Sequence, residues 1–484
     1  MASNQVPPSH HSKSSVKLGS TTHLGSKAHH TGIMLAMGRG ILSVSKLVGK
    51  PLKEDMEIRI DHHYTSKIYT SGSQVSGTVQ ISPRRDTEFS FVEINLLGKA
   101  YVRREDVHVT TETSQLLLKL HMPISESAYP STRTFKSGQN YAIPFRFIIP
   151  HQLTSNACQY KAETETVHNH HLRLPSSLTG FERDDLTTNI TRIQYSVRAR
   201  ILNIRKNGSE APLSPILESQ HPISILAPSP EDPPLILDRY DLHYVLKETK
   251  PVRRNMFSAA TGHITAESCQ PQAIRLNPDG RAASSSSAYV NIGFRPVAPD
   301  MLPPQIKVKS AKVLAQTWLS SRPAPSFPNL RGGREPVTLS TSAVVDSTNT
   351  TPWIQHVHIM GEDGKPERMS RGNKRSEDAA LESSSLDPRV PVTHTCSTHV
   401  DFRLPTLSHV FPPTFHSCLI SRTYTLEITI AAGGCELCLL LPLQIFMDPQ
   451  HDCLQTRLDA DLPSWDEVEG EAVNARLGEP RRLL

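Results

Sequence analysis

The feature that most constrains the fold of this chain is a period of two in its apolar residues, which recurs in short runs from Met56 onward. The run "SQVSGTVQI" alternates Val75, Val79 and Ile81 with polar residues, and "RIQYSVRARIL" alternates in the same way. Such alternation is typical of strands with one buried face. Because no helical run of convincing length lies between these segments, the sequence predicts antiparallel β-sandwiches and not an α/β fold.

The run "YAIPFRFIIP", residues 141–150, has the pattern of a strand that contains prolines. Pro144 and Pro150 share one parity, so their missing N–H groups fall on the same lateral side of a regular strand. That side can lack a neighbouring strand without leaving a buried donor unpaired. The sequence therefore predicts an edge strand that buries Phe145.

Composition divides the chain into two strand-rich regions and several segments that bury little. The expected parts are a disordered basic segment at 1–55, a first sandwich at 56–228, a linker at 229–237, a second sandwich at 238–447 with a disordered insertion at 361–387, and an acidic tail at 448–484. Prolines and acids mark the linker in "APSPEDPP". The insertion is charged, rich in serine and without aromatic residues, which predicts disorder. The expected fold class is thus all-β with two consecutive sandwiches.

The basic N-terminal segment has one amphipathic stretch, Ile33–Val48, with apolar residues at helical spacing opposite basic and polar ones. One interpretation is a helix that lies on an anionic membrane surface. A mitochondrial transit peptide and an unstructured tail are the alternatives.

Cysteine count and net charge indicate the compartment. Seven cysteines, an odd number, are scattered through 484 residues without a secretory leader, which predicts reduced thiols. The longest apolar run, "CELCLLLPLQIF", is shorter than the ~20 residues of a membrane span. Lys and Arg exceed Asp and Glu by five, which suits an anionic membrane better than a nucleic-acid groove. We expect a cytoplasmic protein, peripherally at the plasma membrane or endosomes, that binds no nucleic acid.

The residues offer little catalytic chemistry. No known motif brings together a nucleophile, a base and an orienting group, so we expect no enzyme and no cofactor. Cys435 and Cys438 form a Cys-x-x-Cys, but residues three apart in a strand point to opposite faces. This predicts buried strand cysteines and no metal site. His168, His170 and His171 are expected in a solvated, hairpin-like loop.

Arg192, Arg198 and Arg200 lie on the polar face of the run at 192–202. Arginine forms charge-assisted hydrogen bonds with phosphate and carboxylate groups. One interpretation is therefore a contact with a phosphorylated or acidic partner segment. The alternative is a solvated strand face, whose charges contribute little.

The order of the runs carries a resemblance to a known family. "SGSQVSGTVQI", "VEINLLGKAYV", "FKSGQNYAIPFRFIIP" with Cys158 shortly after, "LRLPSSL" and "IQYSVRARI" follow one another as in the arrestin N-terminal domain. The likeness is to fungal arrestin-like proteins, the alpha-arrestins or arrestin-domain-containing proteins. "PPTFHSCLISRTYTLEITI" and "CELCLLLPLQIF" resemble the last strands of an arrestin C-terminal domain. "DLPSWDEVEGE" resembles the acidic tail box beyond that domain.

The resemblance implies an adaptor that links membrane cargo, a transporter or receptor, to a ubiquitin ligase and to endocytic sorting. In the fungal relatives the link is a Pro-Pro-x-Tyr segment read by WW domains of a HECT-type ligase, which bind polyproline II. This chain has no Pro-Pro-x-Tyr. The candidate protein-binding residues are Pro412, Pro413 and Phe415 in one segment and Leu462, Pro463 and Trp465 in the other.

Two other functions remain open at this point. One is a structural sorting scaffold related to retromer-type arrestin folds, which makes no ligase contact. The other is a metal-binding enzyme that uses the C-terminal cysteines.

Overall fold

The computed structural model describes residues 55–105, 110–203, 215–238, 241–253, 255, 257–330, 335–360, 366–368 and 392–449. The basic segment, the acidic tail and most of the predicted insertion lie outside these residues. The stretch Ile33–Val48 and the tail residues Leu462, Pro463 and Trp465 therefore stay predictions.

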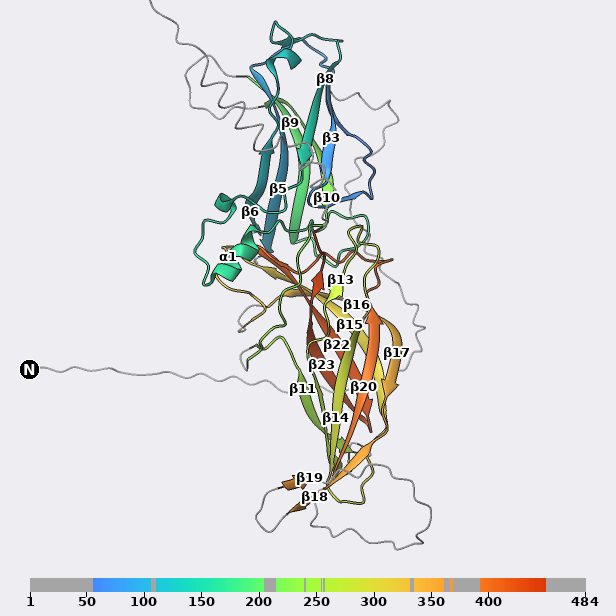
Figure 1. Cartoon of the computed structure of the whole chain (residues 1–484). Helices are drawn as coiled ribbons and strands as arrows, with labels where there is room; N and C mark the ends of the chain where they lie inside the picture. The colour runs from blue at the N-terminus through green and yellow to red at the C-terminus, as the bar shows by residue number, and fades with distance from the viewer. Residues whose placement is uncertain are drawn as a thin grey trace, which may run out of the picture. The chain divides into compact units, whose positions relative to one another are not determined.

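The first strand-rich region forms a β-sandwich of two main sheets (Figure 1). One sheet has the order β1-β3-β8, the other the order β2-β10-β9-β5-β6, and β4 pairs with β7. All neighbours are antiparallel except β2 and β10. The strands are β1 Met56–Ile60, β2 Ile68–Tyr69, β3 Gln74–Ile81, β4 Thr87–Glu88, β5 Phe91–Glu105, β6 Thr110–His121, β7 Thr134–Phe135, β8 Tyr141–Ile148, β9 Thr191–Leu202 and β10 Pro215–Ile225.

Strand β8 lies at the edge of its sheet, as the prolines predict. It pairs with β3, where Gly77 lies opposite Phe145. Phe145 is only 2% exposed, while Pro144 is exposed. A Cβ atom on Gly77 would lie 2.8 Å from the Cζ atom of Phe145, so the ring fills the space that the glycine leaves. The glycine therefore allows the ring of Phe145 to lie close to the backbone of β3.

The second strand-rich region is also built from antiparallel sheets. One sheet has the order β11-β12-β14-β20-β18-β19 with β17 also on β20, another has the order β16-β15-β22-β21 with β23 also on β22, and β13 pairs with β24 in parallel. The strands are β11 Lys247–Arg253, β12 Ala260–Ser268, β13 Ile274–Arg275, β14 Ser286–Pro296, β15 Ile306–Leu319, β16 Val337–Ser342, β17 Val344–Thr350, β18 Ile354–Met360, β19 Pro366–Arg368, β20 Val392–Arg403, β21 Phe415–His416, β22 Ile420–Ala432, β23 Cys435–Leu443 and β24 Ile445–Phe446. The all-β prediction is confirmed.

One predicted loop is wrong. His168, His170 and His171 lie in the helix α1, Glu165–Leu172, which Thr164 caps by accepting a hydrogen bond from the Val167 N–H at 3.3 Å. Val167, His170 and His171 are buried, and the spacing of three and four residues is that of one helix face. Treating histidine as a purely polar residue hides this face.

Three further short elements were not expected. The 3₁₀ turns are η1 Glu126–Ala128 and η2 Ser155–Ala157. Strand β19 falls inside the segment predicted as a disordered insertion and pairs with β18. Among the residues described, no helix has the length and apolar composition that a membrane crossing needs.

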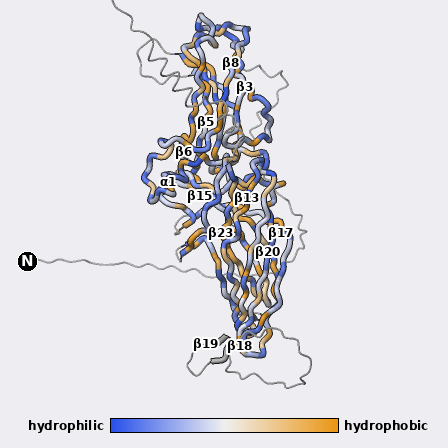
Figure 2. Tube along the Cα trace, in the orientation of Figure 1, coloured by the Kyte–Doolittle hydropathy of each residue, from blue (hydrophilic) through white to orange (hydrophobic). Residues whose placement is uncertain are grey.

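Each region has its own hydrophobic core, and apolar and polar residues alternate along the strands (Figure 2). The cores are not separate in sequence. Phe415, Cys418, Leu419 and Ile420, which surround the start of β22, belong to the first core. Leu186 and Leu226, from the first region, belong to the second.

Candidate functional site

A loop of the first sandwich, residues 179–188, makes hydrogen bonds to the second sandwich. The Arg183 guanidinium donates to the carbonyl oxygen of Gly280 at 3.2 Å and to that of Thr406. The Val410 N–H donates to the Asp184 carbonyl oxygen at 2.9 Å. The loop therefore holds the two sandwiches together through its main chain and through one cation.

The centre of this contact is Arg422 of β22, whose side chain is fully buried. Its guanidinium donates to the carbonyl oxygen of Leu186 at 3.0 Å and to the hydroxyl of Thr187. The Nε atom has no hydrogen-bond partner in the described part of the chain. A buried cation with an incomplete set of partners is costly unless a negative charge lies close by.

Asp185 supplies that charge. Its carboxylate accepts a hydrogen bond from the Thr179 N–H at 2.6 Å. Burial raises the pKa of Asp185, and the nearby Arg422 charge opposes this shift. The interface thus contains a buried acid and a buried base whose charges compensate each other only in part.

The loop that carries Asp185 is strained. Thr179 has a φ of 63° and Leu186 a φ of 55°, which is the left-handed region that residues other than glycine rarely adopt. Each such residue costs on the order of 1–3 kcal/mol and persists only where its surroundings fix it. Thr179 is held by Asp185 of the same loop, whereas Leu186 is held by Arg422, so the strain at Leu186 depends on the second sandwich being in place.

A cavity of about 240 Å³, lined by both apolar and polar residues, lies beside this loop. Lys67, Arg183 and Arg281 contribute cations to its lining, and Glu182 is the one acid among the described lining residues. Burial and the charge of Arg281 lower the pKa of Arg183. An excess of cations around a small cavity suits an acidic ligand.

The arginines singled out in the sequence are engaged with acids on neighbouring strands. Arg200 donates to Glu93 with its Nε atom at 2.9 Å, Arg192 lies 3.3 Å from Glu112, and Arg198 lies 3.9 Å from Glu218. Burial raises the pKa of Glu93, but hydrogen bonds from Asn95, Arg200 and Lys119 overcome this and lower it to about 2. A partner that used these arginines would have to replace their present acids.

The segment with Pro412, Pro413 and Phe415 is buried. The Pro412 carbonyl oxygen accepts a hydrogen bond from the Tyr424 hydroxyl at 2.7 Å. Pro413 is also buried, and Phe415 begins β21 and packs into the first core. A WW domain binds an exposed polyproline II segment, so this stretch is accessible to such a partner only after it leaves the fold.

Cys435 and Cys438 lie in β23, as predicted. Leu437 and Leu439 point into the second core, and Cys435 shares their face while Cys438 lies on the other. Both thiols are half-buried, so the prediction of buried cysteines is wrong on this point, because β23 leaves their positions partly open to solvent. Gly433 and Gly434, with φ of 54° and 88°, form the turn before them and leave the pair itself extended.

Arg422 was missed in the sequence, although a signal was present. It has the same parity in "SRTYTLEITI" as Tyr424, Leu426 and Ile428, which all point into the core. A charged residue on the apolar face of an alternating strand is rare and is normally paired. That position, more than a row of arginines on a polar face, marks a buried charge.

The fold is all-β, with two strand-rich regions coupled through this interface. Residues 56–207, which span β1 to β9, match the family described as arrestin (or S-antigen), N-terminal domain. No curated protein matches the chain significantly. The first sandwich is thus similar to the arrestin N-terminal domain.

Proposed function

We propose that the protein is an adaptor of the alpha-arrestin type, like those of fungi, which links a membrane transporter or receptor to a ubiquitin ligase and to endocytic sorting. The observation that carries this proposal is the match of the first sandwich to the arrestin N-terminal domain. The second sandwich, coupled through Arg422, supports it because an adaptor needs two surfaces held in a fixed relation.

For the cargo contact, we infer that an acidic or phosphorylated cytoplasmic segment of the cargo binds the cationic cavity. Lys67 and Arg281 line the cavity from two loops that are far apart in the sequence. Charge-assisted hydrogen bonds to a carboxylate or phosphate are about twice as strong as neutral ones. The basic segment at 1–55 would add affinity for the anionic membrane in which the cargo lies.

For the ligase contact, the tail residues Leu462, Pro463 and Trp465 are the preferred candidate because the other candidate segment is buried. One proline gives little polyproline II preorganisation, so binding to a WW domain should be weak. The double substitution Leu462→Pro with Trp465→Tyr completes a Pro-Pro-x-Tyr. It should bind a WW domain more tightly than the parent in titration calorimetry, and Trp465→Ala should abolish parent binding. Strong parent binding that Trp465→Ala leaves unchanged would place the contact elsewhere.

The proposed function is tested by proximity labelling in cells with the full chain. Enrichment of transporters or receptors together with a HECT-type ligase is expected. The double charge reversal Lys67→Glu with Arg281→Glu should reduce cargo labelling. Lys307→Glu, at an exposed position of β15, should leave the labelling unchanged. Labelling of coat subunits without any ligase would contradict the adaptor function and favour a sorting scaffold.

A further inference from the structure

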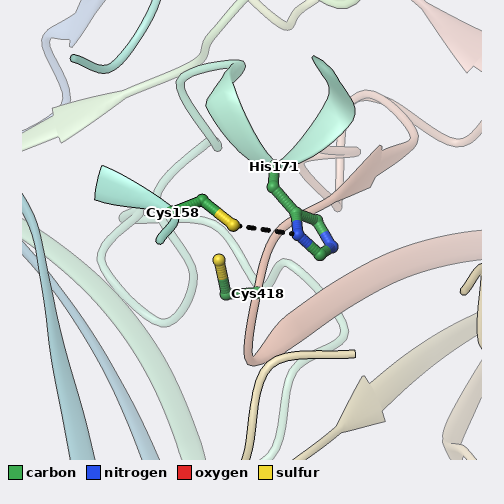
Figure 3. A group of neighbouring side chains, drawn as sticks. All are labelled: Cys158, His171 and Cys418. Atoms are coloured by element: carbon green, nitrogen blue, oxygen red, sulfur yellow. Dashed lines mark hydrogen bonds between the residues drawn. The ribbon is translucent and has the colours of Figure 1, made fainter. Parts of the chain in front are cut away.

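Three buried side chains from distant parts of the chain converge beside α1. Cys158 follows η2, His171 is in α1, and Cys418 lies between β21 and β22 (Figure 3). The two sulfur atoms and one imidazole nitrogen all lie within 4.8 Å of one another. The Cys158 Sγ atom is 3.4 Å from the His171 Nδ1 atom.

These separations fit the ligands of one metal ion. Zn²⁺ binds thiolate sulfur at about 2.3 Å and imidazole nitrogen at about 2.0–2.1 Å in tetrahedral geometry. Two ligand atoms of such a site are therefore roughly 3.5–3.8 Å apart. The distance between Cys158 and His171 is already close to this value, and both cysteines are free.

The environment also suits a neutral metal centre. All three side chains are buried, so a charged centre here would be costly. Two thiolates and a neutral imidazole around Zn²⁺ have no net charge, so burial does not oppose the complex.

A fourth ligand position has a candidate. The Gln115 side chain hydrogen-bonds Cys418, and its Nε2 atom donates to the Ala157 carbonyl oxygen at 3.1 Å. The Gln115 Oε1 atom is buried and has no hydrogen-bond partner among the described residues. The amide N–H faces Cys418, so Gln115 could complete the tetrahedron only with its amide turned to bring Oε1 to the metal; a water molecule is the other candidate.

We propose that Cys158, His171 and Cys418 bind one Zn²⁺ ion in a structural site that ties the first sandwich to the start of β22. On binding, each thiol releases its proton to solvent and each sulfur donates an electron pair to the metal. The site goes beyond the adaptor function, since it fixes the fold and does not depend on any partner. Soft sulfur with nitrogen selects zinc over the oxygen-seeking Ca²⁺ and Mg²⁺.

The test is metal analysis of the full chain, purified with reductant and without a chelator or a metal-affinity resin. Mass spectrometry of the metals should find about one zinc ion per chain. Cys158→Ser and Cys418→Ser should each lose it. Cys396→Ser, a buried cysteine of β20 outside the group, should keep it and is the matched control.

Cobalt binding tests the site in the wild-type chain, so this measurement does not depend on whether the cysteine variants fold. The wild-type chain, stripped of metal and given Co²⁺, should develop the visible and charge-transfer absorption of tetrahedral cobalt thiolate, and Zn²⁺ should abolish it. Either of two results would overturn the proposal: protein without zinc that also fails to bind cobalt, or a Cys158–Cys418 disulfide in the reduced preparation. Copper in place of zinc would overturn the assignment of the metal.

Discussion

The two sandwiches share one interface but contribute different chemistry to it. The first core takes in Phe415, Leu419 and Ile420 of the second region, so this part of the contact is apolar. In another part of the same interface, the loop at 179–188 places Asp185 near the buried Arg422. Neither sandwich is therefore complete alone. Without the second sandwich, the first lacks part of its core. Without the first sandwich, the Arg422 charge of the second has no partner.

The largest effect is expected inside the first core, away from the interface. Phe145→Ala should lower the free energy of unfolding by ~3–5 kcal/mol, because it removes a buried ring and leaves a cavity. Ile148→Ala, on the exposed face of the same strand, is the control and should change little. Equal melting midpoints for Phe145→Ala and the parent would show that the faces of β8 are assigned wrongly.

The interface gives the next prediction. Arg422→Ala should cost about 3 kcal/mol, because it removes a buried cation and leaves the Leu186 carbonyl and the Thr187 hydroxyl without its hydrogen bonds. Arg403→Ala, at an exposed pair with Asp346, should change the unfolding midpoint little in the same chemical denaturation series. A negligible cost for Arg422→Ala would mean that the charge does not couple the sandwiches.

Gly77→Ala tests how tightly β3 and the ring of Phe145 pack within the first sandwich. The new methyl group would meet the carbonyl oxygen of Arg59 and the ring of Phe145. Overpacking of this kind costs about 1–3 kcal/mol. The Ile60 Cα atom is a third close contact. Combining the change with Phe145→Ala removes the contact with the ring, so the double mutant should be less destabilised than the sum of the single changes. Strict additivity in denaturant titrations would contradict the assigned packing.

The smallest effect is the pH dependence of the two buried acids, which has opposite signs. Glu93 has a folded pKa of about 2, below its ordinary 4.5. Its ionised form therefore stabilises the folded state above pH 4.5, and this stabilisation is lost as pH falls towards 2. Asp185 has a raised pKa, so the stability it contributes is present below pH 3.8 and is lost as pH rises through its folded pKa. Denaturation should be measured across pH. Glu93→Gln should remove the loss of stability that occurs as pH falls, and Asp185→Asn should remove the loss of stability that occurs as pH rises. The same slope from both variants would refute this contrast.

Much of the fold was accessible from the sequence because it depends on local pattern. The alternation around Phe145 and the parity of Pro144 and Pro150 predicted the edge strand, and both are properties of ten consecutive residues. The helix α1 was missed because its buried face consists largely of histidines, which have no fixed preference for core or solvent. Sequence patterns predict burial only for residue types that strongly prefer either the core or the solvent.

The candidate sites were less accessible because they arise from contacts between distant residues. Cys158 and Cys418 are separated by most of both sandwiches, so no spacing rule connects them. Arg422 meets Leu186 only when the two regions pack together. The tail residue Trp465, predicted from a short motif, lies outside the described residues and stays a prediction.

The shared core has a consequence for the order of events during synthesis. The first sandwich has all its own strands once Leu226 has left the ribosome, but Phe415 and Ile420 reach its core only after about 190 further residues. At about 5–20 residues per second, the interval is roughly 10–40 s. Throughout it, apolar surface that these residues will cover stays open to water and to chaperones. The first domain to be made is therefore among the last to be finished.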